Sequence, residues 1–229
     1  GVRYVVQGRG SGVAIALADA VHKHNVRNPG REIVYLNDGT DDPSLTSERC
    51  SFWYFSLAPN IDMKMAALSA DLAKSAANRH VYLIAPDDAA GHAIDRSAAT
   101  YLAKRRPEVR IVGREFHPSG QVHDFAPHIA RMKAAGADTI ITGNGGPDLV
   151  AMVRAARDAG LAADFYAFQA DAGGEPAALG AAGVGRVHVV LDWHANAHKP
   201  AGKEIVEGFR KRFDDDFRAS QVYSGMRLL

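Results

Sequence analysis

A glycine-rich segment near the start of the chain carries the residues with the clearest potential for chemistry. The apolar run Tyr4-Val5-Val6 leads into Gln7-Gly8-Arg9-Gly10-Ser11-Gly12, and an apolar helical pattern follows. A strand, a glycine loop and a helix start in this order can hold an anion, because the first N–H groups of a helix lack partners within it. We predict that Ser11 is the N-cap, which by itself is ordinary helix chemistry unless other helix starts converge on it.

The glycine spacing does not match the nucleotide-binding motifs. The dinucleotide fingerprint is Gly-x-Gly-x-x-Gly, and Val13 stands where the third glycine is required. A P-loop needs Gly-Lys-Ser or Gly-Lys-Thr, which the segment lacks. An α/β enzyme with a nucleotide cofactor is therefore disfavoured, and we expect no cofactor.

Three further loops with distinctive residues follow predicted strands. Ligands of open α/β sheets bind outside the carboxyl ends of the strands, and a double glycine lets a ligand approach the backbone closely. Each loop alone is consistent with plain turn chemistry, but four such loops in one chain predict a binding cleft. The three loops are Asn37-Asp38-Gly39-Thr40, Asp87-Asp88-Ala89-Ala90-Gly91 and Thr142-Gly143-Asn144-Gly145-Gly146-Pro147.

The residues of these loops do not form an evident catalytic set. Asp87 and Asp88 are adjacent and therefore diverge in direction, which makes a poor acid–base pair. Ser11 lacks the Gly-x-Ser-x-Gly elbow of a serine nucleophile. We therefore predict a binding protein and not an enzyme.

Metal binding is not expected either. His194 and His198 have helical i,i+4 spacing, but Pro200 and the loop composition argue against a helix there. The single cysteine, Cys50, argues against a zinc site. It is either a lone structural thiol or the partner of a cysteine outside this segment.

The bulk composition is that of an ordinary globular chain. Of its 229 residues 47% are hydrophobic and 23% charged, and the net charge of +1 gives no argument for nucleic acid binding. No apolar stretch nears the 18 residues typical of a membrane span. The chain opens inside a predicted strand and stops inside a predicted helix, so we expect N- and C-terminal parts to be missing.

Strands and helices alternate along the chain, which predicts an α/β fold with mostly parallel sheets covered by helices on both faces. Asn60 is expected to cap one helix, and Gly136 and Gly160 to end two others. The run Lys104-Arg105-Arg106 is expected at the solvated end of a helix. The predicted strands span 3–7, 33–36, 81–85, 109–113, 138–142, 164–168 and 187–191. The predicted helices span 12–24, 60–77, 91–105, 124–135, 147–159, 200–214 and 220–229.

An ordered series of stretches covers essentially the whole chain and resembles a known family. The stretches are YVVQGRGSG, YLNDGTDDPSLT, CSFWYFSLAPN, VYLIAPDDAAGHA, GREFHPSGQVHDFAPHIARMKAAGADTIITGNGG, GLAADFYAFQA and YSGMRLL. In this order they resemble the type I solute-binding proteins of ABC importers, in the leucine/isoleucine/valine-binding branch. The resemblance implies two α/β lobes, joined by three hinge strands, that close over a small solute without catalysis.

The resemblance also implies where the lobes and the ligand contacts lie. Residues 1–58 and 193–229 would form part of lobe I, and residues 59–192 lobe II. Ser11 matches the family position that binds a ligand carboxylate, and Gly39 with Thr40 matches the loop that adds further bonds. The expected ligand-binding set is Ser11, Gly39, Thr40, Asp88, Ala90, Asn144, Gly145, Gln169 and Asp171, where either Gln169 or Asp171 would meet the ammonium group.

Two positions depart from the family pattern. Ala90 and Gly145 stand where the family usually has aromatic side chains, which predicts room for a larger solute or a loosened site. A branched-chain amino acid is thus implied by the family and put in question by these residues.

The expected function is a monomeric periplasmic solute-binding protein that delivers an amino acid or related carboxylate to the membrane permease of an ABC importer. The alternative is a ligand-sensing regulator or receptor domain of the same fold, for example a sensor of amides or aromatic acids. A signal peptide outside this segment would favour transport, and a fused effector would favour sensing.

Overall fold

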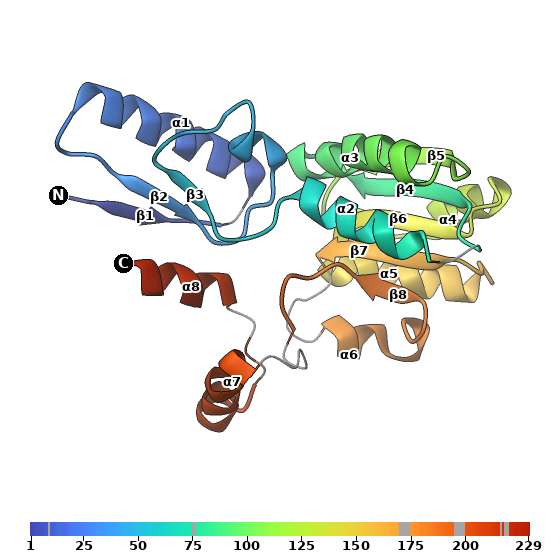
Figure 1. Ribbon diagram of the computed structural model, residues 1–229. Helices are drawn as coiled ribbons and strands as arrows, with labels where there is room; N and C mark the ends of the chain where they lie inside the picture. Colours follow the sequence, from blue (N-terminus) through green and yellow to red (C-terminus); the bar gives the residue numbers. More distant parts are fainter. Residues whose placement is uncertain (9, 75–76, 170–174, 195–199, 216, 218–219) are drawn as a thin grey trace. The chain divides into compact units, whose positions relative to one another are not determined.

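The computed structural model divides the chain into two compact units. Unit 1 comprises Gly1–Pro59 and Leu191–Leu229, and unit 2 comprises Asn60–Val190. Each unit has its own parallel sheet (Figure 1). The structure describes all residues except 9, 75–76, 170–174, 195–199, 216 and 218–219.

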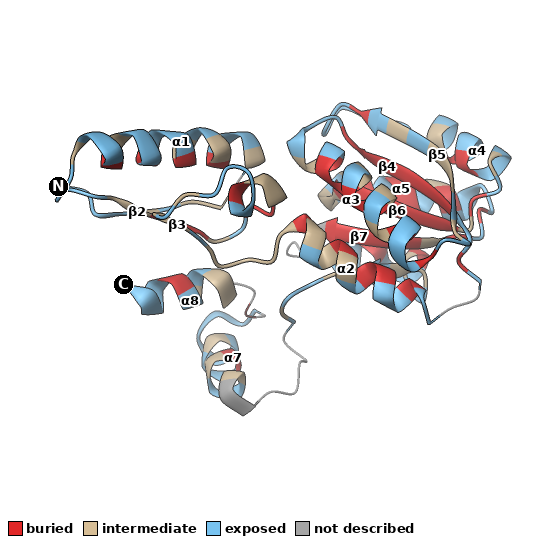
Figure 2. Cartoon of the chain, turned by 45° about the horizontal axis from the view of Figure 1, so that its top comes forward, coloured by how far each residue is buried: buried red, intermediate tan, exposed pale blue. Residues whose placement is uncertain are grey.

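Unit 1 contains a three-stranded parallel sheet of order β1-β2-β3. Helix α1 covers one face of this sheet, and its buried side, shown in red in Figure 2, faces the strands. The remaining helices are a short 3₁₀ helix, η1, and two helices from the end of the chain. The elements are β1 (Tyr4–Val6), α1 (Ser11–Arg27), β2 (Val34–Asn37), η1 (Pro43–Thr46), β3 (Tyr54–Ser56), α7 (Pro200–Phe213) and α8 (Ser220–Leu228).

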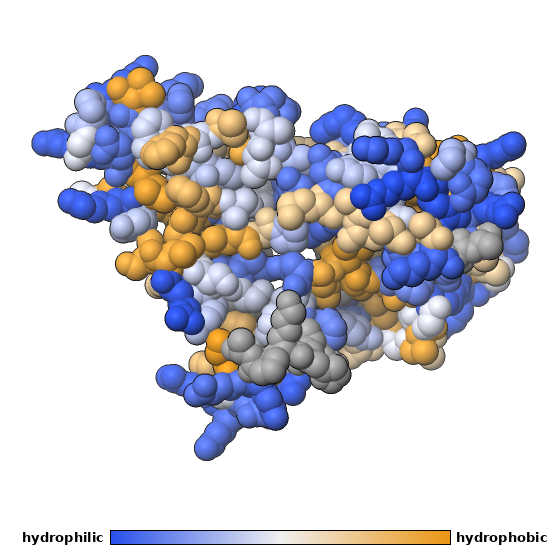
Figure 3. Space-filling view, viewed as in Figure 1, coloured by the Kyte–Doolittle hydropathy of each residue, from blue (hydrophilic) through white to orange (hydrophobic). Residues whose placement is uncertain are grey.

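The core of unit 1 is small. Ala14, Ala18 and Val21 lie on one side of α1 and pack with the buried Tyr35 of β2. Side chains on β1 and β3 such as Val6 and Phe55 remain exposed. In Figure 3 hydrophobic side chains gather over the strands of this unit below α1.

Unit 2 contains a five-stranded parallel sheet of order β5-β4-β6-β7-β8. Helices α2 and α3 pack on one face of the sheet, and α4 and α5 on the other. The elements are α2 (Ile61–Leu72), β4 (His80–Pro86), α3 (Ala89–Arg105), β5 (Arg110–His117), α4 (Ala126–Ala134), β6 (Thr139–Gly145), α5 (Gly146–Asp158), β7 (Asp164–Gln169), α6 (Glu175–Leu179), η2 (Gly180–Ala182) and β8 (Val187–Val189).

In unit 2 the strands β4 and β6, which have helices on both sides, are buried along most of their length. Val81 to Pro86 of β4 and Thr139 to Asn144 of β6 are continuously buried, as expected for strands covered on both faces (Figure 2). The predicted α/β class with parallel sheets flanked by helices is therefore confirmed.

Local signals in the sequence placed several helix ends correctly. The side chain of Asn60 accepts a hydrogen bond from the N–H of Met63 and caps α2. Gly136 and Gly160 follow the ends of α4 and α5 with φ of 68° and 63°, a conformation that glycine adopts at little cost. The sequence pattern predicted neither the helix α6 nor the strand β3.

Lys104 and Arg105 are exposed in the last turn of α3, as predicted, but the expectation of a solvated position is wrong for Arg106. Arg106 is only 4% exposed, and its guanidinium donates to the carbonyl oxygen of Leu72, at the end of α2. It also donates to Glu108. The side chain therefore stabilises a helix C-terminus from inside the protein, where a cation suits the carbonyl dipoles.

Glu115 of β5 forms a charged cluster with α4. Its carboxylate accepts from Arg131 Nε and lies 2.8 Å from His128 Nδ1. Burial alone would raise the pKa of Glu115, but the hydrogen bonds and charges of Arg131 and His128 outweigh it and hold the pKa below 4.5. Because the folded-state pKa is depressed, the stabilisation is present above pH 4.5 and is lost as the pH falls through the folded pKa.

We expect Glu115→Gln to lower the free energy of unfolding by about 1–2 kcal/mol at pH 7. The difference from the wild type should shrink below about pH 4, because the wild-type carboxyl then also loses its charge. Urea denaturation at several pH values measures this. The control is Asp158→Asn, which removes an exposed ion pair with Arg157 and should change stability by less than about 0.5 kcal/mol. An equal loss at pH 7 and pH 3 would contradict the assignment.

Candidate functional site

The loops after β1 and β2 meet backbone to backbone at the carboxyl edge of the sheet in unit 1. A Cβ atom added at Gly8 would lie 2.2 Å from Asp38 Oδ1 and 2.3 Å from the backbone nitrogen of Gly39. Only glycine permits this approach. Gln7, Gly8, Asp38 and Gly39 line a hollow at this place.

Asn37, the last residue of β2, holds the second of these loops. Its Oδ1 accepts hydrogen bonds from the N–H groups of Gly39 (3.3 Å) and Thr40 (2.8 Å). Its Nδ2 donates to the carbonyl oxygen of Thr40 and to Tyr54 Oη. Because Asn37 is fully buried, these bonds give the loop a defined conformation.

Thr40 carries an unused hydrogen-bonding group. The residue is 4% exposed, and its Oγ1 has no hydrogen-bond partner among the residues that the structure describes. A buried hydroxyl without a partner costs about 1–3 kcal/mol. The hydrogen-bonding capacity of this hydroxyl is therefore not used by any residue that the structure describes.

Ser11 lies at the start of α1, but it does not cap the helix as predicted. The N-cap is Gly10, with φ of 76° and ψ of 113°, and Ser11 is the first helical residue. Glycine at the cap brings no side chain, and no hydrogen bond from a cap side chain is present. Within the described residues, no side chain at the cap bonds the first N–H groups of α1, which lie beside Ser11 at the positive end of the helix dipole.

We expect Ser11→Ala to weaken carboxylate binding about tenfold, since a hydrogen bond to a charged group contributes about 1.5–3 kcal/mol. The free energy of unfolding should change by less than about 0.5 kcal/mol, because Ser11 is not the cap. Calorimetry and thermal melting measure the two effects. Ser224→Ala in α8 is the control, since that hydroxyl only donates to the carbonyl oxygen of Ser220. Unchanged affinity in Ser11→Ala would exclude its role.

In unit 2 the loop after β4 holds Asp88 and Ala90 in different ways. Asp88 is the N-cap of α3, and its Oδ1 accepts a hydrogen bond from the N–H of Gly91 (2.8 Å). Ala90 lies in the first turn of α3 and packs partly against the core. Asp88 thus has a structural role that the sequence analysis did not assign to it.

The loop after β6 is built from Asn144, Gly145 and Gly146. Asn144 is buried and bonded within the protein, and Gly145 is the N-cap of α5 in an extended conformation. Gly145 pairs with Gln169, the last residue of β7. Gln169 and Asp171 were the two residues expected to meet an ammonium group. Gln169 lies at this edge of the sheet, and Asp171 lies outside the described residues.

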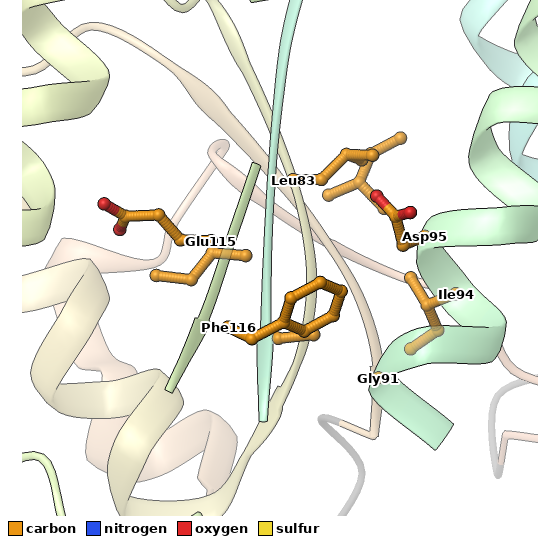
Figure 4. A pocket seen from close by; sticks show the side chains of 9 residues that line it. Leu83, Gly91, Ile94, Asp95, Glu115 and Phe116 are labelled. Carbon is orange, nitrogen blue, oxygen red and sulfur yellow. The ribbon is translucent and has the colours of Figure 1, made fainter. Parts of the chain in front are cut away.

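A second, small pocket lies within unit 2 between β4, β5 and α3 (Figure 4). Leu83, Ile94 and Phe116 are among its mostly apolar lining residues. Its volume of about 10 Å³ admits at most one water molecule. It is therefore too small for a solute of any size.

Candidate metal ligands do not cluster. The described residues include no group of three or more His, Cys, Asp or Glu side chains that could hold a metal ion. His198 lies outside the described residues, so the pair with His194 is not described. Cys50 is exposed with a free thiol. Within the described part of the chain, no helix is long and apolar enough to cross a membrane.

Sequence reasoning missed the residues that shape the two loops in unit 1. Gln7 and Asp38 line the hollow, and Asn37 organises the loop, but none was among the expected ligand-binding residues. The available signal was an asparagine directly after a strand and before Asp-Gly, which is typical of a turn held by its own side chain.

Comparisons with known proteins agree on one family. The family model described as periplasmic binding protein matches residues 1–229. The Leu/Ile/Val-binding protein homolog 4 of Brucella abortus (strain 2308) is 30% identical over 214 residues, which cover 92% of this chain and 50% of the relative. The chain thus spans about half the length of the curated relatives that it matches.

Two solved structures are similar to the chain. The leucine-, isoleucine-, valine-, threonine- and alanine-binding protein of Brucella ovis, in a closed conformation, is 28% identical with a TM-score of 0.87, over 100% of this chain and 58% of that one. An ABC transporter solute-binding protein of R. palustris in complex with benzoate is 17% identical with a TM-score of 0.86, over 99% of this chain and 60% of that one. The second shows likeness of fold alone.

Proposed function

The chain belongs to the periplasmic binding protein family, and from this premise we propose that it binds a small carboxylate solute at the carboxyl ends of its parallel strands. Proteins of this family bind solutes and are not enzymes, so the chain is not an enzyme. The proposal concerns the kind of solute and its contacts.

One observation carries the proposal most directly. At the carboxyl edge of the sheet in unit 1, the buried hydroxyl of Thr40 lacks a described partner, and α1 starts without a side-chain cap. The hydroxyl of Thr40 and the first N–H groups of α1 are hydrogen-bond donors, and a carboxylate accepts from several donors at once. A bound carboxylate would satisfy groups that otherwise cost stability.

Two kinds of observation bear on the class of solute: the names of similar proteins and two small residues of this chain. One relative is named for leucine, isoleucine, valine, threonine and alanine, and another was solved with benzoate. Ala90 and Gly145 are small residues at the carboxyl edge of the sheet in unit 2. We propose that these small residues accommodate a solute bulkier than leucine, such as an aromatic carboxylate.

We further propose that the protein works as a monomer in the periplasm and delivers its solute to the membrane permease of an ABC importer. Similar structures whose titles name an ABC transporter solute-binding or periplasmic ligand-binding protein support the importer role and the periplasmic location. The near-zero net charge gives no support for a nucleic acid partner.

A thermal-shift screen of the full chain tests the proposal. Leucine, valine, benzoate, 4-hydroxybenzoate and the uncharged analogue benzamide would be compared. A solute at 100 times its Kd should add about 2.7 kcal/mol to the stability. We expect stabilisation by at least one carboxylate and none by benzamide. Stabilisation by benzamide alone, or by none of the carboxylates, would refute carboxylate binding.

A further inference from the structure

A buried polar network joins the ends of two strands in unit 2. Thr142 and Asn144 lie on β6, and His117 is the last residue of β5; their exposed fractions are 0%, 1% and 3%. Thr142 Oγ1 donates to Asn144 Oδ1 and accepts from the backbone N–H of Asn144, both at 3.0 Å. Because β4 lies between β5 and β6, the network reaches across the carboxyl end of β4.

The hydrogen bonds in the network have one consistent arrangement for a neutral His117. Its Nδ1 lies 3.1 Å from the carbonyl oxygen of Pro118, which can only accept, so Nδ1 carries the proton. Nε2 then accepts from Asn144 Nδ2 at 2.9 Å. Asn144 Oδ1, 3.1 Å from Nε2, is engaged by the hydroxyl of Thr142. The three buried side chains thus satisfy one another and Pro118.

His117 also reaches the loop after β4 through its backbone. Its carbonyl oxygen accepts from the N–H of Asp87 at 2.8 Å. The ring of Phe125 packs edge-on against the imidazole, with the ring centroids 5.5 Å apart. One residue therefore ties the ends of β4 and β6 to the end of β5.

The Gly145-Gly146 loop that follows Asn144 has no side chains of its own to fix its conformation, although Gly145 pairs with Gln169 of β7. Gly145 is extended, with φ of −143°, and Gly146 is left-handed, with φ of 57°; neither has a side chain. Helix α5 begins there without a side-chain cap, and the pairing with β7 shifts register between Thr142 and Gly145. Because glycine has wide conformational freedom, we expect the conformation of the loop to depend on Asn144, the last residue before it with an anchored side chain.

We propose that Thr142, Asn144 and His117 are positioning residues that hold the Gly145-Gly146 loop in the conformation that contacts the solute. This inference rests on the proposed function. It replaces the expectation that Asn144 is itself a ligand contact, because its amide is already bonded to Thr142 and His117.

The test is Thr142→Val, which keeps the shape of the side chain but leaves Asn144 Oδ1 and the Asn144 N–H without their partner. For whichever of leucine, valine, benzoate and 4-hydroxybenzoate stabilises the wild type, we expect the affinity to fall about 3- to 30-fold. Thr142→Ser retains the hydroxyl and should restore most of the affinity.

The matched control is Thr139→Val at the opposite end of the same strand. Thr139 is also 0% exposed, and its Oγ1 is bonded to Asn78 Nδ2 (2.9 Å) and Asp138 Oδ1 (2.8 Å). Thr139→Val should lower the melting temperature and leave the affinity for the solute unchanged. Equal affinity losses in Thr142→Val and Thr139→Val, or none in Thr142→Val, would overturn the proposal.

Nuclear magnetic resonance supplies a readout that does not depend on a solute. In Thr142→Val the amide signals of Gly145 and Gly146 should move more than in Thr139→Val, and unchanged signals would refute the positioning role. If none of the four carboxylates binds the wild type, the proposed solute class fails, while these signals still decide whether the network holds the loop.

Discussion

Gly8→Ala is expected to reduce carboxylate affinity at least roughly a hundredfold, the largest effect of any single substitution at the candidate site. The added Cβ would lie 2.3 Å from the backbone nitrogen of Gly39 and 2.2 Å from Asp38 Oδ1. A backbone atom cannot move aside as the end of a flexible side chain can, so the two loops must separate. If this separation removes two hydrogen bonds to the charged carboxylate of the solute, at about 1.5–3 kcal/mol each, the affinity falls by about this factor.

The same substitution should lower the free energy of unfolding by about 1–3 kcal/mol, the usual cost of overpacking. Calorimetry and urea denaturation separate the two effects. Gly208→Ala in α7 is the matched control, because a Cβ there meets nothing within 4 Å. Gly208→Ala should raise the free energy of unfolding by about 0.5–1 kcal/mol through helix propensity and leave the carboxylate affinity unchanged. A Gly8→Ala protein with wild-type affinity would show that the contact between the loops does not shape the site.

Thr40→Val is expected to weaken binding about tenfold or more without any loss of stability. Valine has the shape of threonine but lacks the hydroxyl, and that hydroxyl has no partner among the described residues. Removing a buried, unsatisfied polar group should leave stability unchanged or raise it by about 1 kcal/mol. Removing a donor to a charged solute should lower affinity.

Opposite signs for stability and affinity distinguish a ligand contact from a structural residue. Thr40→Ser should restore binding, because it returns the hydroxyl. Thr46→Val, at an exposed threonine of η1 that donates to the carbonyl oxygen of Pro43, should change both quantities little. If Thr40→Val instead destabilises the protein and binds normally, the hydroxyl serves the fold and not the solute.

Most of the fold could be predicted because its signals are local. The alternation of apolar runs and helical patterns predicted parallel sheets covered by helices, and the solved relatives share that fold. Asn60, Gly136 and Gly160 act on helix ends within a few residues of themselves, so their neighbours in sequence were sufficient. Helix α6 is only five residues long, which is too short for a periodic pattern.

The loops of the candidate site could be located but not interpreted. Parallel strands bring their carboxyl ends to one edge, so the loops after β1, β2, β4 and β6 could be singled out from the sequence. Within those loops the role of each residue depends on its partners. Asp88 caps α3, Ser11 is not a cap, and Asn144 is bonded inside the protein.

By itself, then, the sequence determined the α/β class, several helix ends and the four loops, since each of these follows from residues close together in the chain. The tertiary structure decided which polar groups are used and which are left over. His117 meets Asn144 across 27 positions, and Gly8 meets Gly39 between two loops. The hydroxyl of Thr40 has no partner among the described residues for the same reason: whether a buried polar atom finds a partner depends on which distant segments pack beside it.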